Sequence, residues 1–184
     1  HDPAFALPVY TRLSDAEENE RVRLSKDDPR NLVTGVQDIE FDQVLYRPLD
    51  AAHVADVAKL EARVMEGAPW TEKTISDELA AAGYLWWAAF SRGEEGSAKL
   101  VAYVGGLVAG DVLEVLRVGT DPEWRRRGIA RELIAHLASD ARDLGAQSCM
   151  LEVRADNKPA QALYESIGLE RVGVRAKYYD NAVD

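Results

Sequence analysis

Residues 120–130 have the sequence Thr120-Asp121-Pro122-Glu123-Trp124-Arg125-Arg126-Arg127-Gly128-Ile129-Ala130. They follow an apolar run, Val112 to Gly119, that predicts a β-strand, and they precede a long amphipathic helix. The apolar stripe of that helix consists of Ile129, Leu133, Ile134, Leu137, Ala141 and Leu144, and Gly145 ends it. Because another predicted strand, Ser148 to Arg154, comes next, the pattern indicates an α/β fold with a strand–helix–strand crossover.

The start of this helix is a predicted anion site. Its first N–H groups have no partner within the helix and lie at the positive end of the helix dipole. Gly128 has no side chain, so a diphosphate could approach the backbone there, and Arg126, Arg127 and Arg131 add positive charge. Taken alone, an Arg-x-x-Gly-x-Ala match is more often a solvated basic turn. Its position between an apolar strand and a long helix favours the binding site.

A carboxylate and a phenol lie on neighbouring predicted elements further along the chain. Strand alternation places Glu152 on the opposite face from its apolar neighbours. Asn157 can cap the short helix Pro159 to Ile167, and Tyr164 shares a helix face with that cap. A strand Glu and a helix Tyr that converge could supply the base and the acid of an acyl transfer. Each residue alone is more often an ordinary strand or helix residue, and only the nearby loop favours a catalytic pair.

The rest of the sequence predicts one mixed α/β domain over residues 43–184. A strand, Val44 to Leu49, precedes two helices for which Asp50 and Thr71 are candidate N-caps. The order βααβββαβαβ is completed by three further predicted strands, Tyr84 to Ser91, Lys99 to Leu107 and Leu169 to Tyr179. Residues 1–42 are expected to form a partly irregular N-terminal extension, because their apolar positions are scattered and prolines interrupt them.

Two segments resemble the GNAT superfamily of acetyltransferases, and within it the RimI-type enzymes that acetylate protein N-termini. Arg125 to Ala130 is similar to the Gln/Arg-x-x-Gly-x-Gly/Ala signature that binds the pyrophosphate of acetyl-CoA. Leu151 to Leu169 is similar to the segment Leu-Glu-Val-Arg-x-x-Asn…Ala-Leu-Tyr-x-x-x-Gly-Phe. The resemblance implies the GNAT fold, in which helices flank a mixed, mostly antiparallel central sheet with a strand–helix–strand acetyl-CoA-binding core.

The resemblance also implies a role for each matching residue. Glu152 would be the proton acceptor and Tyr164 the proton donor, with acetyl-CoA as cosubstrate and no metal. The residues that would hold acetyl-CoA are Val118, Gly119, Thr120, Arg126, Arg127, Gly128, Ile129, Ala130, Arg131 and Asn157. Trp70, Tyr178 and Tyr179 would line the acceptor groove, since they lie in segments similar to the family's Pro-Trp-Ser-Glu-Lys and Arg-x-x-Tyr-Tyr elements. A core plug for Trp70 and plain strand pairing for the two tyrosines remain open alternatives.

The resemblance spans Val44 to Asp180 and has two departures. Gly119-Thr120 stands where Ala-Val is more usual. Such enzymes usually have one more strand after the position of Asp184, so that strand is either absent or supplied in another way.

Composition narrows the environment and the partners. The formal net charge of −10 argues against a grip on nucleic-acid phosphates and favours basic peptides. A lone cysteine, Cys149, cannot form an internal disulfide and fits the reducing cytosol. The apolar runs are shorter than the roughly 20 residues of a membrane helix, so a cytoplasmic protein without membrane contact is expected. His53 and His136 have no second ligand at metal spacing, and no metal is expected.

We therefore expect transfer of an acetyl group from acetyl-CoA to the N-terminal α-amine of a protein, by direct attack in a ternary complex. The resemblance implies the N-terminal alanine of a small-subunit ribosomal protein as the acceptor. One alternative is a GNAT enzyme that acetylates lysine side chains or a small amine. The other, from a different class, is a non-catalytic CoA-binding interaction module.

Overall fold

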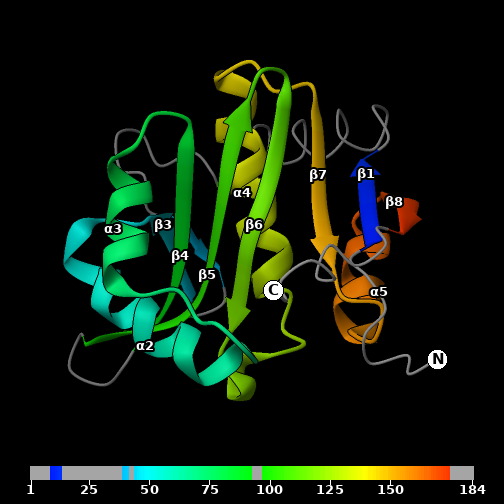
Figure 1. The fold of residues 1–184 in the computed structure, drawn as a ribbon. Coiled ribbons are helices and arrows are strands. Elements are labelled where there is room, and N and C mark those ends of the chain that lie inside the picture. The colour runs from blue at the N-terminus through cyan, green and yellow to red at the C-terminus, as the bar shows by residue number, and fades with distance from the viewer. Residues whose placement is uncertain (1–8, 14–38, 42–43, 93–96, 175–184) are drawn as a thin grey trace, which may run out of the picture.

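The structure is a computed structural model that describes residues 9–13, 39–41, 44–92 and 97–174. These residues form an eight-stranded sheet with the strand order β2-β3-β4-β5-β6-β7-β1-β8 (Figure 1). The strands are β1 (Val9–Leu13), β2 (Ile39–Phe41), β3 (Val44–Pro48), β4 (Tyr84–Arg92), β5 (Ala98–Ala109), β6 (Val112–Thr120), β7 (Ser148–Val153) and β8 (Leu169–Val174). Neighbouring strands are antiparallel except β6 and β7, which are parallel.

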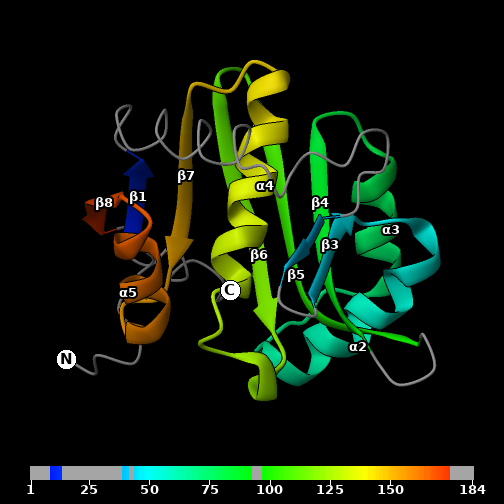
Figure 2. The ribbon, with the colours of Figure 1, turned by 180° about the vertical axis from the view of Figure 1, so that it is seen from behind.

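Helices cover both faces of the sheet. One face carries α2 (Val54–Val64), which follows the 3-10 turn η3 (Ala51–His53), and α3 (Glu72–Ala80). The other face carries α4 (Ile129–Asp143) and α5 (Lys158–Ser166), and Figure 2 shows α4 in front of β5 and β6 from that side. A second 3-10 turn, η5 (Pro122–Trp124), connects β6 to the loop before α4. From β3 onward the order of elements is the predicted βααβββαβαβ. In the part of the chain that is described, no helix is long and apolar enough to cross a membrane.

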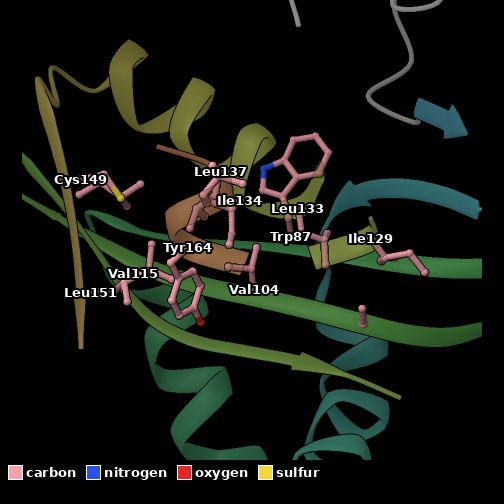
Figure 3. Close-up of a cluster of buried hydrophobic side chains, with 14 of the residues drawn as sticks. Trp87, Val104, Val115, Ile129, Leu133, Ile134, Leu137, Cys149, Leu151 and Tyr164 are labelled. Atoms are coloured by element: carbon pink, nitrogen blue, oxygen red, sulfur yellow. The ribbon is translucent and has the colours of Figure 1, made fainter. Parts of the chain in front are cut away.

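Strand alternation builds a separate core on each face of the sheet. Trp86 and Trp87 are neighbours on β4, so they face opposite sides, and both are buried. Trp86 packs with Ile75 and Tyr103 under α2 and α3. Trp87 packs with Leu133 and other residues of α4 in the second cluster, which Figure 3 shows. We call the face of the sheet that carries α2 and α3 the α2 side, and the face that carries α4 and α5 the α4 side.

The two predicted helix caps differ in outcome. Thr71 caps α3 as predicted, because its hydroxyl accepts a hydrogen bond from the Thr74 N–H at 3.2 Å. The prediction for Asp50 is wrong. Asp50 precedes the 3-10 turn η3 without a side-chain capping hydrogen bond, and its carboxylate lies 2.6 Å from Nδ1 of His53. The N-cap of the α-helix, which begins at Val54, is His53.

The described parts of the N-terminal region belong to the sheet. Strand β1 is inserted between β7 and β8 and is antiparallel to both, and β2 extends the opposite edge beside β3. In the ladder with β7, Tyr10 is paired with Glu152. The sequence carried a signal for β1 in the β-branched and aromatic run Val9-Tyr10-Thr11. The predicted boundary between residues 1–42 and 43–184 stays a prediction.

Strands β6 and β7 part before they end. Their parallel ladder runs from the pair Val112–Ser148 to the pair Val115–Leu151, while β6 continues to Thr120 and β7 to Val153. At the same level a bulge opposite Gly105 and Gly106 of β5 adds Leu116 to β6. Because a bulge bends its strand, it turns β6 away from β7. Figures 1 and 2 both show the two strands close at their starts and separated at their ends.

Candidate active site

We call the region between the separated ends of β6 and β7 the opening, and among the described residues the backbone groups along one side of it have no strand partner. β5 pairs with β6 as far as Thr120, but within the described residues no strand pairs with the other edge of β6 beyond Val115. The predicted acetyl-CoA residues Val118, Gly119 and Thr120 form this edge. Their N–H and C=O groups can therefore bind an extended amide-containing ligand as a partner strand would.

The loop between β6 and α4 has the geometry of an anion site. Arg126 and Gly128 are both left-handed, with φ of 60° and 78°. An added Cβ at Gly128 would meet nothing within 4 Å, so its backbone conformation rather than crowding favours glycine. The first bond of α4 runs from the Glu132 N–H to the Gly128 carbonyl, which leaves the N–H groups of the three residues between them without a partner inside the helix. Such a turn at a helix N-terminus suits a diphosphate.

The predicted cofactor residues of this loop divide by environment. Arg126 is exposed beside the helix start. Arg127 donates to the Glu123 carbonyl at 3.2 Å and lies 4.5 Å over the Trp124 ring, so part of its donor capacity is used within the loop. Arg131 donates to the Ser166 carbonyl at 3.0 Å and thereby connects α4 to the end of α5.

Two further residues assigned to the cofactor, Ile129 and Ala130, occupy the first turn of α4. Ile129 is 2% exposed and packs in the core, so only its backbone can serve a ligand. Ala130 is half-buried. Asn157 is the N-cap of α5, as predicted, and accepts a hydrogen bond from the Ala160 N–H at 3.2 Å. A contact of Asn157 with CoA stays a prediction.

Glu152 and Tyr164 lie on opposite sides of the sheet near the end of the β6–β7 ladder. Leu151 and Val153 are buried on the α4 side, so Glu152 between them faces the α2 side, where it is exposed. Tyr164 is 8% exposed and belongs to the α4-side cluster with Leu151 and Val115, the last paired residues of the ladder (Figure 3). Burial, with a smaller effect of Cys149, raises the pKa of Tyr164 to about 12. Its phenol therefore stays protonated at neutral pH, as a general acid must.

Trp70 lies on the α2 side in the connection between α2 and α3. It is half-buried, and its ring centroid lies 6.0 Å from that of Trp86. Its backbone N–H donates to Oε1 of Glu61 at 3.1 Å. One part of Trp70 is thus packed and another is accessible, which leaves both interpretations of its role open. Tyr178 and Tyr179, the other predicted acceptor residues, lie outside the described residues.

An exposed ion pair follows the end of β7. Arg154 directly follows β7, and its Nη2 donates to Oδ2 of Asp156 at 2.8 Å. This pairing holds the pKa of the Arg154 guanidinium above its usual range.

A buried polar cluster beside Trp70 was missed by the sequence analysis. Glu61 is 1% exposed, accepts a hydrogen bond from the Tyr103 hydroxyl, and lies 3.3 Å from Nε of Arg117. The sequence held a signal for it, because Glu61 lies on the apolar stripe of α2 between Val57 and Val64. A charged residue at such a position needs a partner, and the partners come from β5 and β6, far along the chain.

Among the residues that the structure describes, no three His, Cys, Asp or Glu side chains gather to hold a metal ion. The described site therefore consists of a parted pair of strands, a left-handed turn at a helix start, an exposed carboxylate and a buried phenol. It offers backbone partners for an extended ligand, a turn that suits an anion, a carboxylate and a phenol, whose predicted roles as base and acid stay predictions.

This chain belongs to the Acetyltransferase (GNAT) family, which it matches over residues 54–169, more than half of its length. It is 38% identical over 145 residues to the N-alpha-acetyltransferase RimI of Mycobacterium tuberculosis, a match that covers 76% of this chain and 87% of that protein. It is 34% identical over 143 residues to an uncharacterized protein of Mycobacterium leprae, which covers 75% of this chain but only 38% of that protein.

Solved structures show the same fold. The crystal structure of the ribosomal-protein-S18-alanine N-acetyltransferase from Escherichia coli superimposes with a TM-score of 0.62 at 29% identity, over 76% of this chain and 85% of that chain. AAC(6')-Iy in complex with a CoA-containing bisubstrate analogue superimposes with a TM-score of 0.63 at 17% identity, over 76% of this chain and 99% of that chain. The predicted fold and family are confirmed, and with them the class of enzyme, an acetyltransferase.

Proposed function

We propose that this protein transfers the acetyl group of acetyl-CoA to the N-terminal α-amine of a protein, with the N-terminal alanine of a ribosomal protein as its acceptor. The observation that carries the proposal is the opening between β6 and β7, where Glu152 is exposed on one side and Tyr164 is buried on the other. The names of the relatives from M. tuberculosis and E. coli support the choice of acceptor.

The residues around the opening fit acetyl-CoA. The free edge of β6 at Val118, Gly119 and Thr120 would hold the pantetheine arm through backbone hydrogen bonds. The turn at Arg126 and Gly128 would hold the diphosphate with the N–H groups that begin α4. Acetyl-CoA supplies an activated thioester, and the remaining steps belong to the side chains of this chain.

Glu152 would accept a proton from the acceptor ammonium, directly or through water, on the α2 side of the sheet. The free amine then attacks the thioester carbon, a C–N bond forms, and the oxyanion is stabilised by backbone N–H groups of β6. When the C–S bond breaks, Tyr164 donates its proton to the departing thiolate. The nitrogen loses two protons, one to Glu152 before the attack and one from the tetrahedral intermediate as the amide forms. One proton reaches the sulfur and a net one is released to solvent, so the transfer is balanced without an acyl-enzyme.

An α-amine is the acceptor that this arrangement suits best. With a pKa near 7.7 to 8.0, about one α-amine in ten is already neutral at pH 7, against fewer than about one lysine side chain in a thousand with a pKa near 10.4. A single exposed carboxylate is therefore sufficient for an N-terminus. The net charge of −10 further favours a basic acceptor peptide. We keep a cytoplasmic location, and the absence of nucleic-acid and membrane contacts, as predictions.

The test is release of free CoA from acetyl-CoA in the presence of three peptides. The first is a basic peptide that begins with alanine, the second is the same peptide with a blocked N-terminus, and the third has an internal lysine as its only amine. Release with the first peptide alone supports the proposal. Equal rates with the blocked peptide would replace it by lysine acetylation, and binding of CoA without turnover would favour a non-catalytic module.

A further inference from the structure

We propose that Arg117 hydrogen-bonds to a main-chain carbonyl of the acceptor peptide and that Glu61 holds it in position. This makes Arg117 a specificity-determining residue that favours a peptide N-terminus over a small amine. The inference rests on the proposed function and concerns the α2 side of the opening, where the acceptor would enter.

The position of Arg117 places it beside the opening. It follows the bulged residue Leu116 and lies two residues beyond Val115, where the β6–β7 ladder ends. Its side chain lies over Trp70 on the α2 side, the same side of the sheet on which Glu152 is exposed. Arg117 on β6 and Glu152 on β7 therefore flank the opening on the face from which an amine would approach the base.

Three contacts fix the guanidinium. Its Nε lies 3.3 Å from Oε1 of Glu61, its Nη2 donates to the Ala68 carbonyl at 3.1 Å, and its Cζ lies 4.5 Å from the centre of the Trp70 ring. Glu61 also accepts from the Trp70 N–H, so one buried carboxylate orders both the arginine and the connection against which it stacks. A side chain held in this way loses little conformational entropy when it binds a ligand.

The guanidinium keeps a free donor. An arginine has five N–H donors, and within the described part of the chain Arg117 has one hydrogen bond, from Nη2 to the Ala68 carbonyl, while its Nε is buried beside Glu61 without a hydrogen bond. The side chain is 23% exposed, so a ligand in the opening can reach it. A planar donor beside a strand edge suits a carbonyl oxygen, which every acceptor peptide offers and a simple amine lacks.

Charge balance explains why a cation is tolerated near an ammonium substrate. Glu61 is 1% exposed and lies against Arg117, so the pair is close to neutral toward the opening. Glu78 on α3 is a second carboxylate that interacts electrostatically with Arg117. Without these carboxylates the arginine would repel the acceptor ammonium. With them, Arg117 acts as a hydrogen-bond donor whose charge is compensated inside the protein.

The first test compares Arg117→Gln and Arg117→Lys with the control Lys59→Gln. Lys59 lies on α2 and is 74% exposed, so its replacement removes a positive charge on the same side of the sheet without touching the cluster. We expect the Arg117 variants to raise the KM for the alanine peptide about 10- to 100-fold, the cost of one hydrogen bond from a charged donor. The KM for acetyl-CoA should stay within about twofold of the wild-type value. An equal rise in both KM values, or no rise in the peptide KM, would overturn the proposal.

The second test identifies the peptide carbonyl that Arg117 binds. Its first readout uses wild-type enzyme, so it does not require that a variant folds. In a series of peptides, one of the first three carbonyl oxygens at a time is replaced by sulfur, a weaker acceptor. Wild-type enzyme should lose activity at one position of the series. In the Arg117→Gln variant, sulfur at that same position should cause no further loss of activity. If every thioamide penalty in wild-type enzyme persisted unchanged in the variant, Arg117 would not be the donor.

The role of Glu61 is tested by a double-mutant cycle. Glu61→Gln keeps the shape of the side chain but removes its charge, so we expect it to raise the peptide KM as the Arg117 variants do. Adding Glu61→Gln to Arg117→Gln should raise the peptide KM little further, because both substitutions remove the same positioned guanidinium. Additive effects would contradict a positioning role. Failure of wild-type enzyme to acetylate any N-terminus would instead refute the proposed function, so the two failures are distinguishable.

Discussion

The ring of Tyr103 lies where a β-carbon on residue 119 would have to be. Tyr103 is fully buried on β5, is paired with Gly119 across the β5–β6 ladder, and donates its hydroxyl hydrogen to Glu61. Glycine at 119 is therefore required by packing on the α2 side. This explains the glycine at position 119, since the space of a methyl group there is taken by the tyrosine.

Gly119→Ala should destabilise the protein by about 1–3 kcal/mol, because it overpacks a filled site. Gly173→Ala on β8 is the matched control, since a β-carbon there meets nothing within 4 Å, and it should be close to neutral. The measurement is urea unfolding of each variant. In the background of Tyr103→Leu, the cost of Gly119→Ala should fall markedly, and an unchanged cost would contradict the packing argument.

Gly128→Ala should weaken acetyl-CoA binding. A left-handed backbone costs a non-glycine residue about 1–2 kcal/mol, so the substitution favours another conformation of the turn that holds the diphosphate. We expect a rise of about tenfold in the KM for acetyl-CoA with little change in kcat. Gly110→Ala is the control, because Gly110 has φ of 63° and open space but lies in the β5–β6 turn. A rise in KM in both variants would argue against a role of the 126–128 turn in binding.

Tyr164→Phe should lower kcat about 100- to 10,000-fold, as expected for loss of a general acid. The dissociation constant of acetyl-CoA should change little, because the ring remains in place. Since the pKa of Tyr164 is raised to about 12, the wild-type kcat should show no loss from its ionisation up to pH 10. Tyr46→Phe provides the control, a buried tyrosine packed against His136 in the same cluster. Full activity of Tyr164→Phe would exclude the phenol as the proton donor.

His136 should make the fold sensitive to mild acid. It is 8% exposed, stacks on Trp87 with ring centroids 4.6 Å apart, and burial lowers its pKa to about 4. Between pH 6.5 and 4 the unfolded chain binds a proton that the folded chain does not, so stability falls as the pH falls, by about 3 kcal/mol in all. The measurement is the free energy of unfolding, obtained by urea unfolding of wild type and His136→Phe at several pH values between 6.5 and 4. The variant should lose less stability on acidification, and parallel curves would contradict the assignment.

Local patterns predicted most of the elements and the local backbone structure around the candidate site residues, whose roles stay predictions. The apolar period of α4, the glycine before it and the alternation around Glu152 are short-range features, and each is found as predicted. Pairing of β1 between β7 and β8 depends on residues more than a hundred positions away, which local periodicity does not report. The same holds for Glu61, whose burial is explained only by Tyr103 and Arg117. At Asp50 a contact with His53 competed with the predicted cap.

Mass spectrometry can locate the acetyl group on a peptide that has both a free N-terminal alanine and an internal lysine, so it separates α-amine from lysine acetylation on one substrate. The experiment compares wild-type protein with Glu152→Gln, which keeps the shape of the side chain and removes the base. We predict that wild-type protein places one acetyl group on the α-nitrogen and that Glu152→Gln does so at least about 100-fold more slowly. Acetylation of the lysine, or an undiminished rate in Glu152→Gln, would contradict the account.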